Sequence, residues 1–282
     1  MKQKISVVIN TLNEEWNLPY AIRSVHSWAD EIVVVDMYSD DRTVEIAKQY
    51  GAKVYFHERI AAFDAARQFA IEQATNEWVL LLDADEMTPE PLSRILLEIV
   101  DFNKVDIVII PRLNFLLGMP LMHTGWGPHQ DKHPRLFKKS KMTTSDTIHD
   151  FMRPADGVNI HEINYDNGLA IVHFNYVDSM EFIDKLNKYT SIEARQAHER
   201  GELASYGHAI YQVFKEFPNR YIRKGGFRDG WRGFYLSLSM AFYRLNIFSK
   251  MKELEIYGAR DKIIKIYAKE AEKVLASYEE HQ

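Results

Sequence analysis

The chain of 282 residues contains no cysteine. This absence excludes disulfide bonds, thiolate zinc sites and cysteine nucleophiles. The sequence also lacks an apolar run near the roughly 20 residues that a membrane-spanning helix needs. The charged start Met1–Lys4 leads directly into an apolar run and has no signal-peptide h-region. These absences predict a cytoplasmic protein without a transmembrane anchor.

Acidic and basic residues are unevenly distributed along the chain. The net charge is −5, from 35 Lys+Arg and 40 Asp+Glu. Between Pro218 and Lys252, eight basic residues stand against the single acid Asp229, a local charge of +7 that leaves −12 for the rest. The segment 218–252 is also rich in aromatic residues. A basic, aromatic segment of this kind predicts an anionic partner. Nucleic acid is not expected as that partner, because the rest of the chain is acidic and carries no recognisable nucleic-acid-binding module.

The central part of this basic segment has the periodicity of an amphipathic helix. Over 231–249 one face carries the apolar residues Phe234, Leu238, Ala241, Leu245 and Phe248. Such a helix with basic ends suits the interface of a membrane with anionic headgroups. The alternative is a core helix whose apolar face packs on the rest of the protein and whose charges are solvated.

Short apolar runs alternate with helix-like stretches over the first hundred residues, which is typical of βα units and a parallel sheet. Strands are expected at 5–10, 31–36, 53–56, 78–82 and 105–110. The runs 33–35 and 79–82 are continuously apolar, which indicates burial on both faces. The sequence therefore predicts an α/β fold with a doubly wound, mainly parallel sheet, whose ligands bind at the carboxyl ends of its strands.

Helix boundaries and a later change of pattern complete the expected organisation. Ser39 or Asp40 is expected to cap a helix that ends at Gly51, and Thr88 to cap one that begins at Pro89. Periodicity fades over 112–171, and so long an irregular stretch is usually functional. Asp178 begins a C-terminal helical extension, with a domain boundary near Val177. Its helices are expected at 179–200, 203–216, 231–249 and 253–279.

The sharpest local pattern is Asp83-Ala84-Asp85, directly after the apolar run Trp78–Leu82. The two carboxylates are two residues apart and so lie on the same side of the chain, at the edge where ligands bind. Paired carboxylates there suit Mg²⁺ or Mn²⁺ that bridges to phosphate oxygens. The alternative is an acidic turn at the start of the next helix.

Polar residues at other strand ends are expected to meet this pair. Thr11 and Asn13 follow the first strand, Asp36 ends the second, and Arg67 lies in the helix before the acidic pair. The short polar groups suit directional hydrogen bonds to a nucleobase, and Arg67 suits a phosphate. Each also has a structural alternative as a cap, a strand end or a solvated helix residue. Glycine-rich phosphate loops of the GxxxxGK[ST] or GxGxxG type are absent.

Four segments, taken in order, resemble the successive motifs of family 2 glycosyltransferases with the GT-A fold. They are Ile5–Glu14, Val33–Asp36 with Ser39, Asp41 and Thr43, Ala65–Gln68, and Leu82–Glu86. The resemblance implies inverting transfer of a sugar from a nucleotide-sugar donor. It also implies that residues 1–111 bind the donor and that 112–177 hold the acceptor and catalytic residues, before the extension 178–282.

The resemblance also implies roles for single residues. It places Arg67 near the diphosphate, Asp83 at the ribose and metal, and Asp85 at the metal. Around the base and ribose it places Thr11, Asn13, Glu14 and Asp36. The sequence departs from the family at Leu12, where an aromatic residue often stacks on the base, and at Met37-Tyr38, where Asp-Gly is common. Uridine is the favoured base.

Later motifs narrow the resemblance to bacterial lipopolysaccharide-core glucosyltransferases. They are His133–Lys139, Ile148–Asp150, His173–Tyr176 and Tyr221–Gly230. This subgroup implies transfer of a hexose, glucose in the favoured case, from a UDP-sugar to a lipid-linked saccharide of the cell envelope. The enzyme would then attach peripherally to the inner face of the cell membrane.

Inversion in one displacement needs a base for the acceptor hydroxyl and positive charge near the departing diphosphate. Asp150 is the expected base, with Asp131 and Glu162 as alternatives. His149 is expected to touch the metal or the diphosphate. Arg135 is expected to assist the diphosphate or to pair with the acidic surface.

Two other functions fit parts of the pattern. Aspartyl-phosphate hydrolases also place such an acidic pair after an apolar strand and use the first Asp as nucleophile. They usually have Thr or Val where this chain has Met87, and their pair follows the first strand. A non-catalytic protein that binds nucleotide sugars or membranes is the second alternative.

Overall fold

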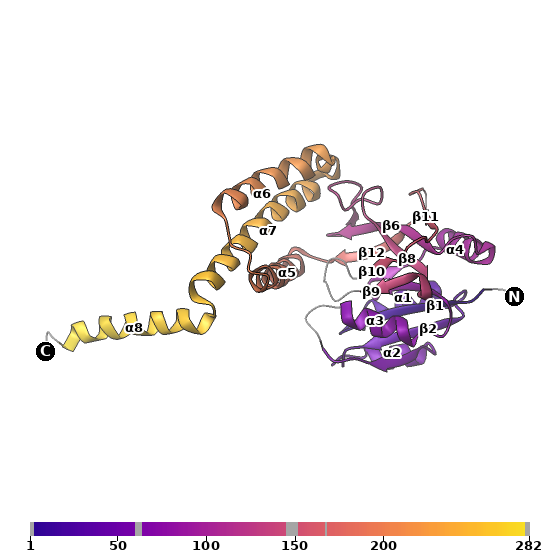
Figure 1. Cartoon of the computed structure of the whole chain (residues 1–282), viewed down its shortest axis with the longest axis horizontal. Helices are drawn as coiled ribbons and strands as arrows, with labels where there is room; N and C mark the ends of the chain where they lie inside the picture. Colours follow the sequence, from indigo (N-terminus) through magenta and orange to yellow (C-terminus); the bar gives the residue numbers. More distant parts are fainter. Residues whose placement is uncertain (1–2, 60–63, 145–151, 167, 280–282) are drawn as a thin grey trace. The chain divides into compact units, whose positions relative to one another are not determined.

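The computed structural model describes residues 3–59, 64–144, 152–166 and 168–279. The chain forms two compact units, Met1–Val177 and Asp178–Gln282. The first unit is an α/β domain with a mixed, mostly parallel sheet, and the second consists of helices (Figure 1). The predicted fold class, an α/β sheet domain of the GT-A type with a C-terminal helical extension, is confirmed.

Four parallel strands form the first half of the sheet, and all four were predicted. Their spatial order is β3 (Lys53–Phe56), β2 (Glu31–Asp36), β1 (Ile5–Thr11) and β4 (Trp78–Asp83). The strand order reverses at β1, which pairs with β2 on one side and with β4 on the other. Such a topological switch point is where open α/β sheets bind ligands. In the register of the sheet Thr11 faces Asp36, and Asn10 faces Asp83.

The second half of the sheet is mixed. Strand β8 (Lys132–Lys138) runs antiparallel between β4 and β6 (Ile107–Leu116), and β12 (Ile171–Tyr176) runs parallel to β6. Strand β5 (Glu86–Met87) pairs with β12, while β7 (Met119–Pro120) and β11 (Ile160–Glu162) pair with β6. Strands β9 (Met142–Thr144) and β10 (Met152–Pro154) form a small separate sheet, and η1 (Lys139–Lys141) is a 3₁₀ turn.

The expectation of irregular structure over 112–171 was therefore wrong in part. The strand expected at 105–110 begins at Ile107 and continues to Leu116, and β8 lies within the supposedly irregular stretch. Both contain polar residues that break the apolar pattern and pair with other parts of the candidate site: Asn114 of β6 contacts Asp131 and His173, and Arg135 of β8 contacts Asp83 and Glu86. Periodicity fails here because these strands bury polar side chains in pairs.

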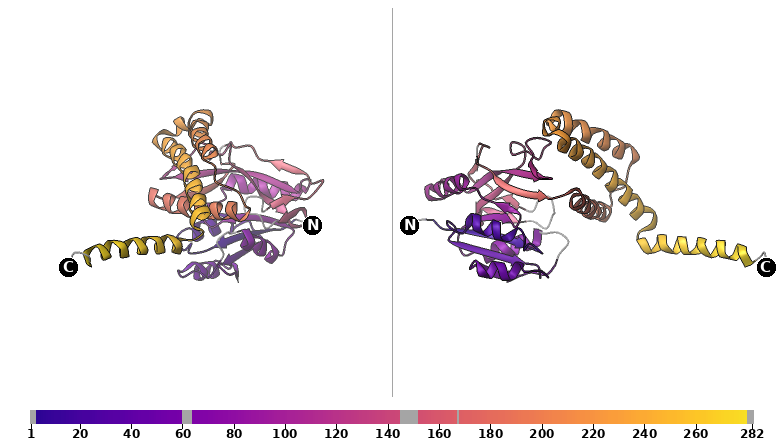
Figure 2. Two further views of the ribbon diagram at one scale, coloured as in Figure 1. Left: turned by 60° about the vertical axis from the view of Figure 1, so that its left-hand side comes forward. Right: turned by 180° about the vertical axis from the view of Figure 1, so that it is seen from behind.

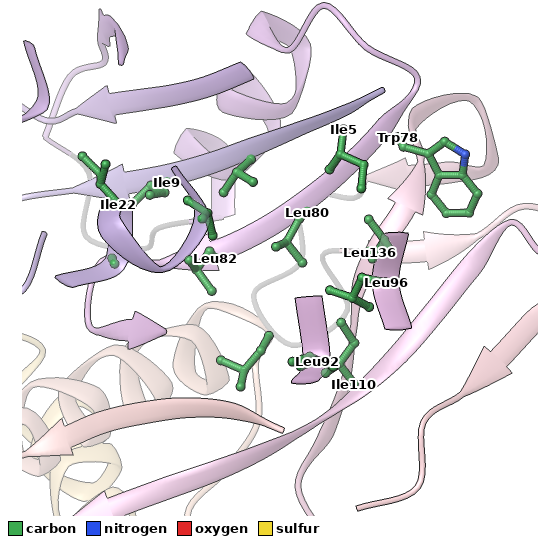
Figure 3. Packing of buried hydrophobic residues seen from close by; sticks show 14 of the residues in the cluster. Ile5, Ile9, Ile22, Trp78, Leu80, Leu82, Leu92, Leu96, Ile110 and Leu136 are labelled. Carbon is green, nitrogen blue, oxygen red and sulfur yellow. The ribbon is translucent and has the colours of Figure 1, made fainter. Parts of the chain in front are cut away.

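Helices cover both faces of the sheet. Helices α1 (Leu18–Val25), α2 (Thr43–Gln49) and α4 (Glu90–Phe102) pack in one apolar cluster, and α3 (Asp64–Gln73) packs in another. Successive residues of β4 alternate between the two clusters, which confirms the predicted burial on both faces. Figure 3 shows the first cluster, with Leu92 and Leu96 of α4 near Ile110 and Leu136 of the sheet.

Two predicted helix starts were wrong. Helix α2 begins at Thr43, whose backbone N–H donates to the side chain of Asp41 at 3.0 Å; Ser39 is instead engaged with Asp36. Helix α4 begins at Glu90, because Pro89 has extended backbone angles and occupies the N-cap position that was expected for Thr88. The predicted stop at Gly51 holds, since α2 ends just before this residue, which has a φ of +75°.

The second unit contains α5 (Ser179–Glu199), α6 (Tyr206–Pro218), α7 (Gly230–Tyr257) and α8 (Arg260–Glu279). Asp178 caps α5 as predicted, since its side chain accepts a hydrogen bond from Glu181 N at 2.8 Å. Helices α6 and α7 lie side by side (Figures 1 and 2), joined by the short turns η2 (Asn219–Arg223) and η3 (Gly226–Asp229). A Cβ atom at Gly233 would lie 1.8 Å from the Gly226 carbonyl oxygen, so only glycine fits there. Within the described ranges, none of the helices combines the length and apolarity that crossing a bilayer requires.

Candidate active site

Asp36 is the centre of the site at the ends of β1 and β2. It is fully buried, and its carboxylate accepts hydrogen bonds from Thr11 Oγ1 at 2.9 Å, Ser39 N at 2.8 Å and Ser39 Oγ at 2.5 Å. The structure thus brings Thr11 and Asp36 together, as the sequence predicts. A carboxylate has about four acceptor positions, so roughly one is left for another donor.

The loops after β1 and β2 are joined through Asn13 and Glu14. Asn13 N donates to Ser39 Oγ, and Asn13 Oδ1 accepts from Asp40 N, both at 2.8 Å. Glu14 N donates to Thr43 Oγ1 at 2.8 Å, and the Glu14 side chain accepts from Asn17. Both predicted donor-binding residues therefore join the loop after β1 to the segment that follows β2, Asn13 through Ser39 and Glu14 through Thr43.

Asp83 lies between two arginines at the end of β4. Its Oδ1 accepts from Arg67 Nη2 at 2.8 Å and its Oδ2 from Arg135 Nη2 at 3.1 Å. Burial alone would raise the pKa of Asp83, but the charges of Arg67 and Arg135 hold it well below its usual range. Asp83 is thus an ionised carboxylate that holds both guanidinium groups at the carboxyl edge of the sheet.

Arg135 is buried and also pairs with Glu86, which is itself fully buried, at 2.7 Å. Burial would lower the pKa of Arg135, but Glu86 and Asp83 raise it above its ordinary value. Glu86 Oε2 also accepts from Asp83 N at 2.9 Å. Arg135 thus pairs with Asp83 and the buried Glu86 and not with the acidic surface, and its expected role at the diphosphate stays a prediction. Sequence reasoning had assigned no role to Glu86.

Asp85, the second carboxylate of the pair, contacts His173 of β12. Asp85 Oδ2 lies 3.2 Å from His173 Nε2. The two carboxylates, which were expected to form a single site, therefore have different partners: Asp83 pairs with Arg67 and Arg135, and Asp85 contacts a histidine. His173 had been noted only within the subgroup motif, because a lone histidine in a strand carries no periodic signal.

Asn114 fixes the orientation and tautomer of His173. Its amide Nδ2 donates to Trp126 O at 2.8 Å and to Asp131 Oδ2 at 2.6 Å, so its Oδ1 is the atom that faces His173 Nδ1, at 2.6 Å. Nδ1 must then carry a proton, and Nε2 is the ring nitrogen that faces the Asp85 carboxylate. A ring nitrogen and a carboxylate oxygen on one side of a site are both atoms that can ligate a metal cation.

Asp85 and His173 can supply two ligands to a divalent metal ion. Among the described residues, no group of three or more His, Cys, Asp or Glu side chains is arranged to hold a metal. Mg²⁺ commonly takes one or two protein ligands and completes its shell with water and substrate phosphates. The donor set therefore fits a cation that is held jointly by the protein and a diphosphate.

The alternative bases Asp131 and Glu162 are both engaged. Burial would raise the pKa of Asp131, but hydrogen bonds and charges from His133, Arg112 and Asn114 lower it, so it is a weak proton acceptor. Glu162 pairs with Lys132 at 2.5 Å and lies beside Ile109 in the sheet. That position is five residues from Asn114 along β6, about 16 Å at 3.3 Å per residue. The predicted residues His149 and Asp150 lie outside the described residues.

Comparison with known proteins identifies the family. Residues 6–155, more than half of the chain, match the family model described as Glycosyl transferase family 2, and the chain belongs to this family. It is 28% identical over 271 residues to the lipopolysaccharide core biosynthesis glycosyltransferase LpsC of Rhizobium meliloti, which covers 93% of this chain and 97% of that protein. It is 29% identical over 266 residues to a glycosyltransferase of Rickettsia typhi, which covers 90% of this chain and 88% of the relative.

A solved structure with a more distant likeness is that of glucosyl-3-phosphoglycerate synthase from Mycobacterium tuberculosis in complex with Mn²⁺ and UDP-glucose. It is 18% identical, covers 72% of this chain and 81% of that chain, and has a TM-score of 0.46. The predicted membership in family 2, with a lipopolysaccharide-core enzyme among the relatives, is confirmed by the family model and by LpsC. The aspartyl-phosphate hydrolases belong to a different class of enzyme.

Proposed function

We propose that this chain is a metal-dependent, inverting glycosyltransferase that moves a hexose, glucose in the favoured case, from a UDP-sugar to a lipid-linked saccharide. The observation that carries the proposal is the contact between Asp85 and His173 at 3.2 Å, on the same sheet edge as Asp36 and Arg67. A relative named for lipopolysaccharide core biosynthesis supports the acceptor class. Mg²⁺ or Mn²⁺ is the proposed cofactor.

Different strand ends are proposed to bind different parts of the donor. Asp36 and Thr11 end β2 and β1 and are proposed to bind the base and ribose. Asp83 ends β4 and is proposed to lie at the ribose and metal, and Arg67 of α3, which pairs with Asp83, is proposed to bind the diphosphate. Asp85 and His173 would hold the metal ion, which would offset the charge of the departing diphosphate. Arg135 and Glu86 hold Asp83 in place through hydrogen bonds to its side chain and its backbone N–H. Because Asp83 in turn pairs with Arg67, the Arg67 side chain is oriented before substrate binds.

Transfer requires one proton acceptor and one leaving group. The acceptor oxygen attacks the anomeric carbon while its proton passes to a carboxylate, and the bond to UDP breaks with its electron pair on the phosphate oxygen. Asp150 remains the proposed base. Asp131 is less suited, because its carboxylate already accepts from Arg112, Asn114 and His133.

An anionic membrane surface is the proposed partner of the second unit. The α7 residues Phe234, Leu238 and Leu245, expected on one apolar face, are exposed, as is Phe214 of α6. Val213 of α6 and apolar residues of α7 line a groove of about 690 Å³. Of the other two residues expected on this face, Ala241 is buried and Phe248 packs on Tyr206, so the second unit leaves part of the face exposed, which supports a membrane role.

Unneutralised cations lie in the turns that join these two helices. Arg223, Lys224 and Arg228 have no carboxylate within ion-pair distance in the part of the chain that the structure describes. Burial and the neighbouring charges of Arg220 and Arg223 lower the pKa of Lys224. A cluster of like charges next to an apolar face suits anionic headgroups above acyl chains. Peripheral attachment to the inner face of the cell membrane follows as part of the proposal.

Asp85→Asn tests the catalytic proposal, because it removes the charge and keeps the shape. We expect Mn²⁺-dependent glucose transfer from UDP-glucose to fall at least about 100-fold, the scale for loss of a preorganised charged group. Asp101→Asn, an exposed site on α4, is the matched control and should leave the rate unchanged. Full metal-dependent activity in Asp85→Asn would contradict the mechanism. If the wild type binds UDP but neither transfers the sugar nor slowly hydrolyses the donor, the non-catalytic alternative is favoured.

A further inference from the structure

Tyr38 has a backbone conformation that a bulky residue rarely adopts. Its φ is +56°, in the left-handed region that favours glycine. The side chain is 58% exposed, so burial in the core does not offset the strain. A strained, exposed aromatic residue at a ligand-binding edge indicates a role in binding.

The surrounding turn holds Tyr38 in this conformation. Arg59 donates from Nε to Met37 O at 3.1 Å and from Nη2 to the Tyr38 carbonyl, and it pairs with Asp40 at 2.5 Å. On the other side, Ser39 N donates to Asp36 Oδ1. The backbone on both sides of Tyr38 is therefore fixed, and its ring is presented outward.

The ring of Tyr38 stacks on a second exposed ring, that of Phe56. The ring centroids are 5.3 Å apart, with an angle of 23° between the planes, and Phe56 is 45% exposed. Phe56 ends β3 and faces Asp36 in the register of the sheet. This aromatic pair, Tyr38 and Phe56, therefore borders the strand end that carries the buried Asp36.

We infer that the aromatic pair binds the base of the donor nucleotide by stacking, an inference that rests on the proposed function. Aromatic side chains stack on any base, because every base has a π face. Leu12 offers no ring at this edge, whereas the aromatic pair does. Asp36 then supplies the directional hydrogen bond, and the aromatic pair supplies the affinity.

The strand order favours the base over the sugar as the occupant. The aromatic pair lies at β2 and β3, whereas Asp83 lies on β4 and His173 on β12, further across the sheet. From β3 to β4 is three strand spacings, about 14 Å. A nucleotide laid along this edge has its base on the aromatic pair when its diphosphate is at Arg67, beside Asp83.

The test compares Tyr38→Gly with wild type in two ligand titrations by calorimetry with Mn²⁺ present. We expect UDP to bind about 5- to 150-fold more weakly to Tyr38→Gly, the range for loss of one stacked base. Inorganic pyrophosphate, which has no base, should bind equally to both proteins. Since glycine relieves the left-handed strain, the Tm should be unchanged or raised.

Further variants separate stacking from structure. Tyr38→Phe keeps the ring and should bind UDP like wild type, while Tyr38→Asn, which tolerates the left-handed backbone, should match the glycine variant. Phe102→Ala removes a 72% exposed ring on α4 and should change nothing. Wild-type UDP affinity in Tyr38→Gly, or a lowered Tm together with weaker binding of both ligands, overturns the inference. If wild type itself binds no uridine nucleotide, the proposed function fails instead.

Discussion

Asn114→Ala is expected to lower the affinity of the enzyme for its metal ion, although Asn114 is not itself a proposed metal ligand. Asn114 is buried, and its Oδ1 lies 2.6 Å from His173 Nδ1. Its removal frees the His173 ring to rotate and to change tautomer. Loss of such an outer partner typically costs 10- to 100-fold in metal affinity or activity, which is about 1.4 to 2.8 kcal/mol.

The same substitution also affects stability. The amide of Asn114 donates to Trp126 O and Asp131 Oδ2, and a buried group left without its partner costs about 1–3 kcal/mol. A domain with an ordinary 5–15 kcal/mol of stability remains folded under that loss. A thermal melt of the variant is therefore part of the experiment.

The assay is the initial rate of glucose transfer as a function of Mn²⁺ concentration, at saturating UDP-glucose. We expect the half-saturating Mn²⁺ concentration to rise 10- to 100-fold and kcat to recover at high Mn²⁺. Asn246→Ala, which removes a side-chain hydrogen bond within α7, is the matched control. A lower kcat with unchanged Mn²⁺ dependence would refute the link from Asn114 through His173 to the metal.

Two further predictions concern pH and membranes. Burial would raise the pKa of the Glu31 carboxyl, but hydrogen bonds from Lys53, Ser6 and Thr75 lower it to about 2. The ionised carboxylate therefore stabilises the folded state fully above its ordinary pKa of 4.5, and this stabilisation is lost as the pH falls toward 2. In urea melts, this group should account for a fall of at most about 3 kcal/mol in the free energy of unfolding between pH 5 and pH 2. If Glu31→Gln loses as much stability over this range as wild type, the pH dependence comes from other groups. Replacing Arg223, Lys224 and Arg228 with Gln should weaken sedimentation with phosphatidylglycerol vesicles about 100-fold, at about 1 kcal/mol per charge. The same change at Lys262, Lys265 and Lys269 of α8 should have a much smaller effect, and equal effects would mean that net charge alone governs binding.

The first half of the sheet could be predicted because its signals are local. Each strand is a continuous apolar run followed at once by polar residues, and parallel strands bring those residues to one edge. Thr11 and Asp36 therefore meet, and Asp83 ends a strand at the same edge, where Arg67 of α3 pairs with it. The error at α2 arose because Ser39 bonds to Asp36 in the turn and leaves the helix start to Asp41 and Thr43.

The second half could not be predicted in the same way, because its pairings are distant in sequence. His173 and Asp85 are 88 residues apart, and Arg135 and Glu86 are 49 apart. Strands β8 and β12 carry charged and aromatic residues whose partners lie on other strands, so no periodic pattern marks them. A buried ionic network is visible only once the strand order is known.

The position of β8 between β4 and β6 has a consequence for how this enzyme reaches its native state. Residues 1–111 contain the strands proposed to bind the donor, but β4 gains its second neighbour only from Lys132–Lys138. A nascent chain that ends before β8 presents β4 as an open edge with unpaired backbone groups, the kind of edge that promotes aggregation. Closure of the sheet has to wait for these non-local contacts, and such contacts slow folding. We therefore expect that residues 1–111 do not fold on their own and that a truncation at 111 is insoluble, whereas Met1–Val177 is soluble.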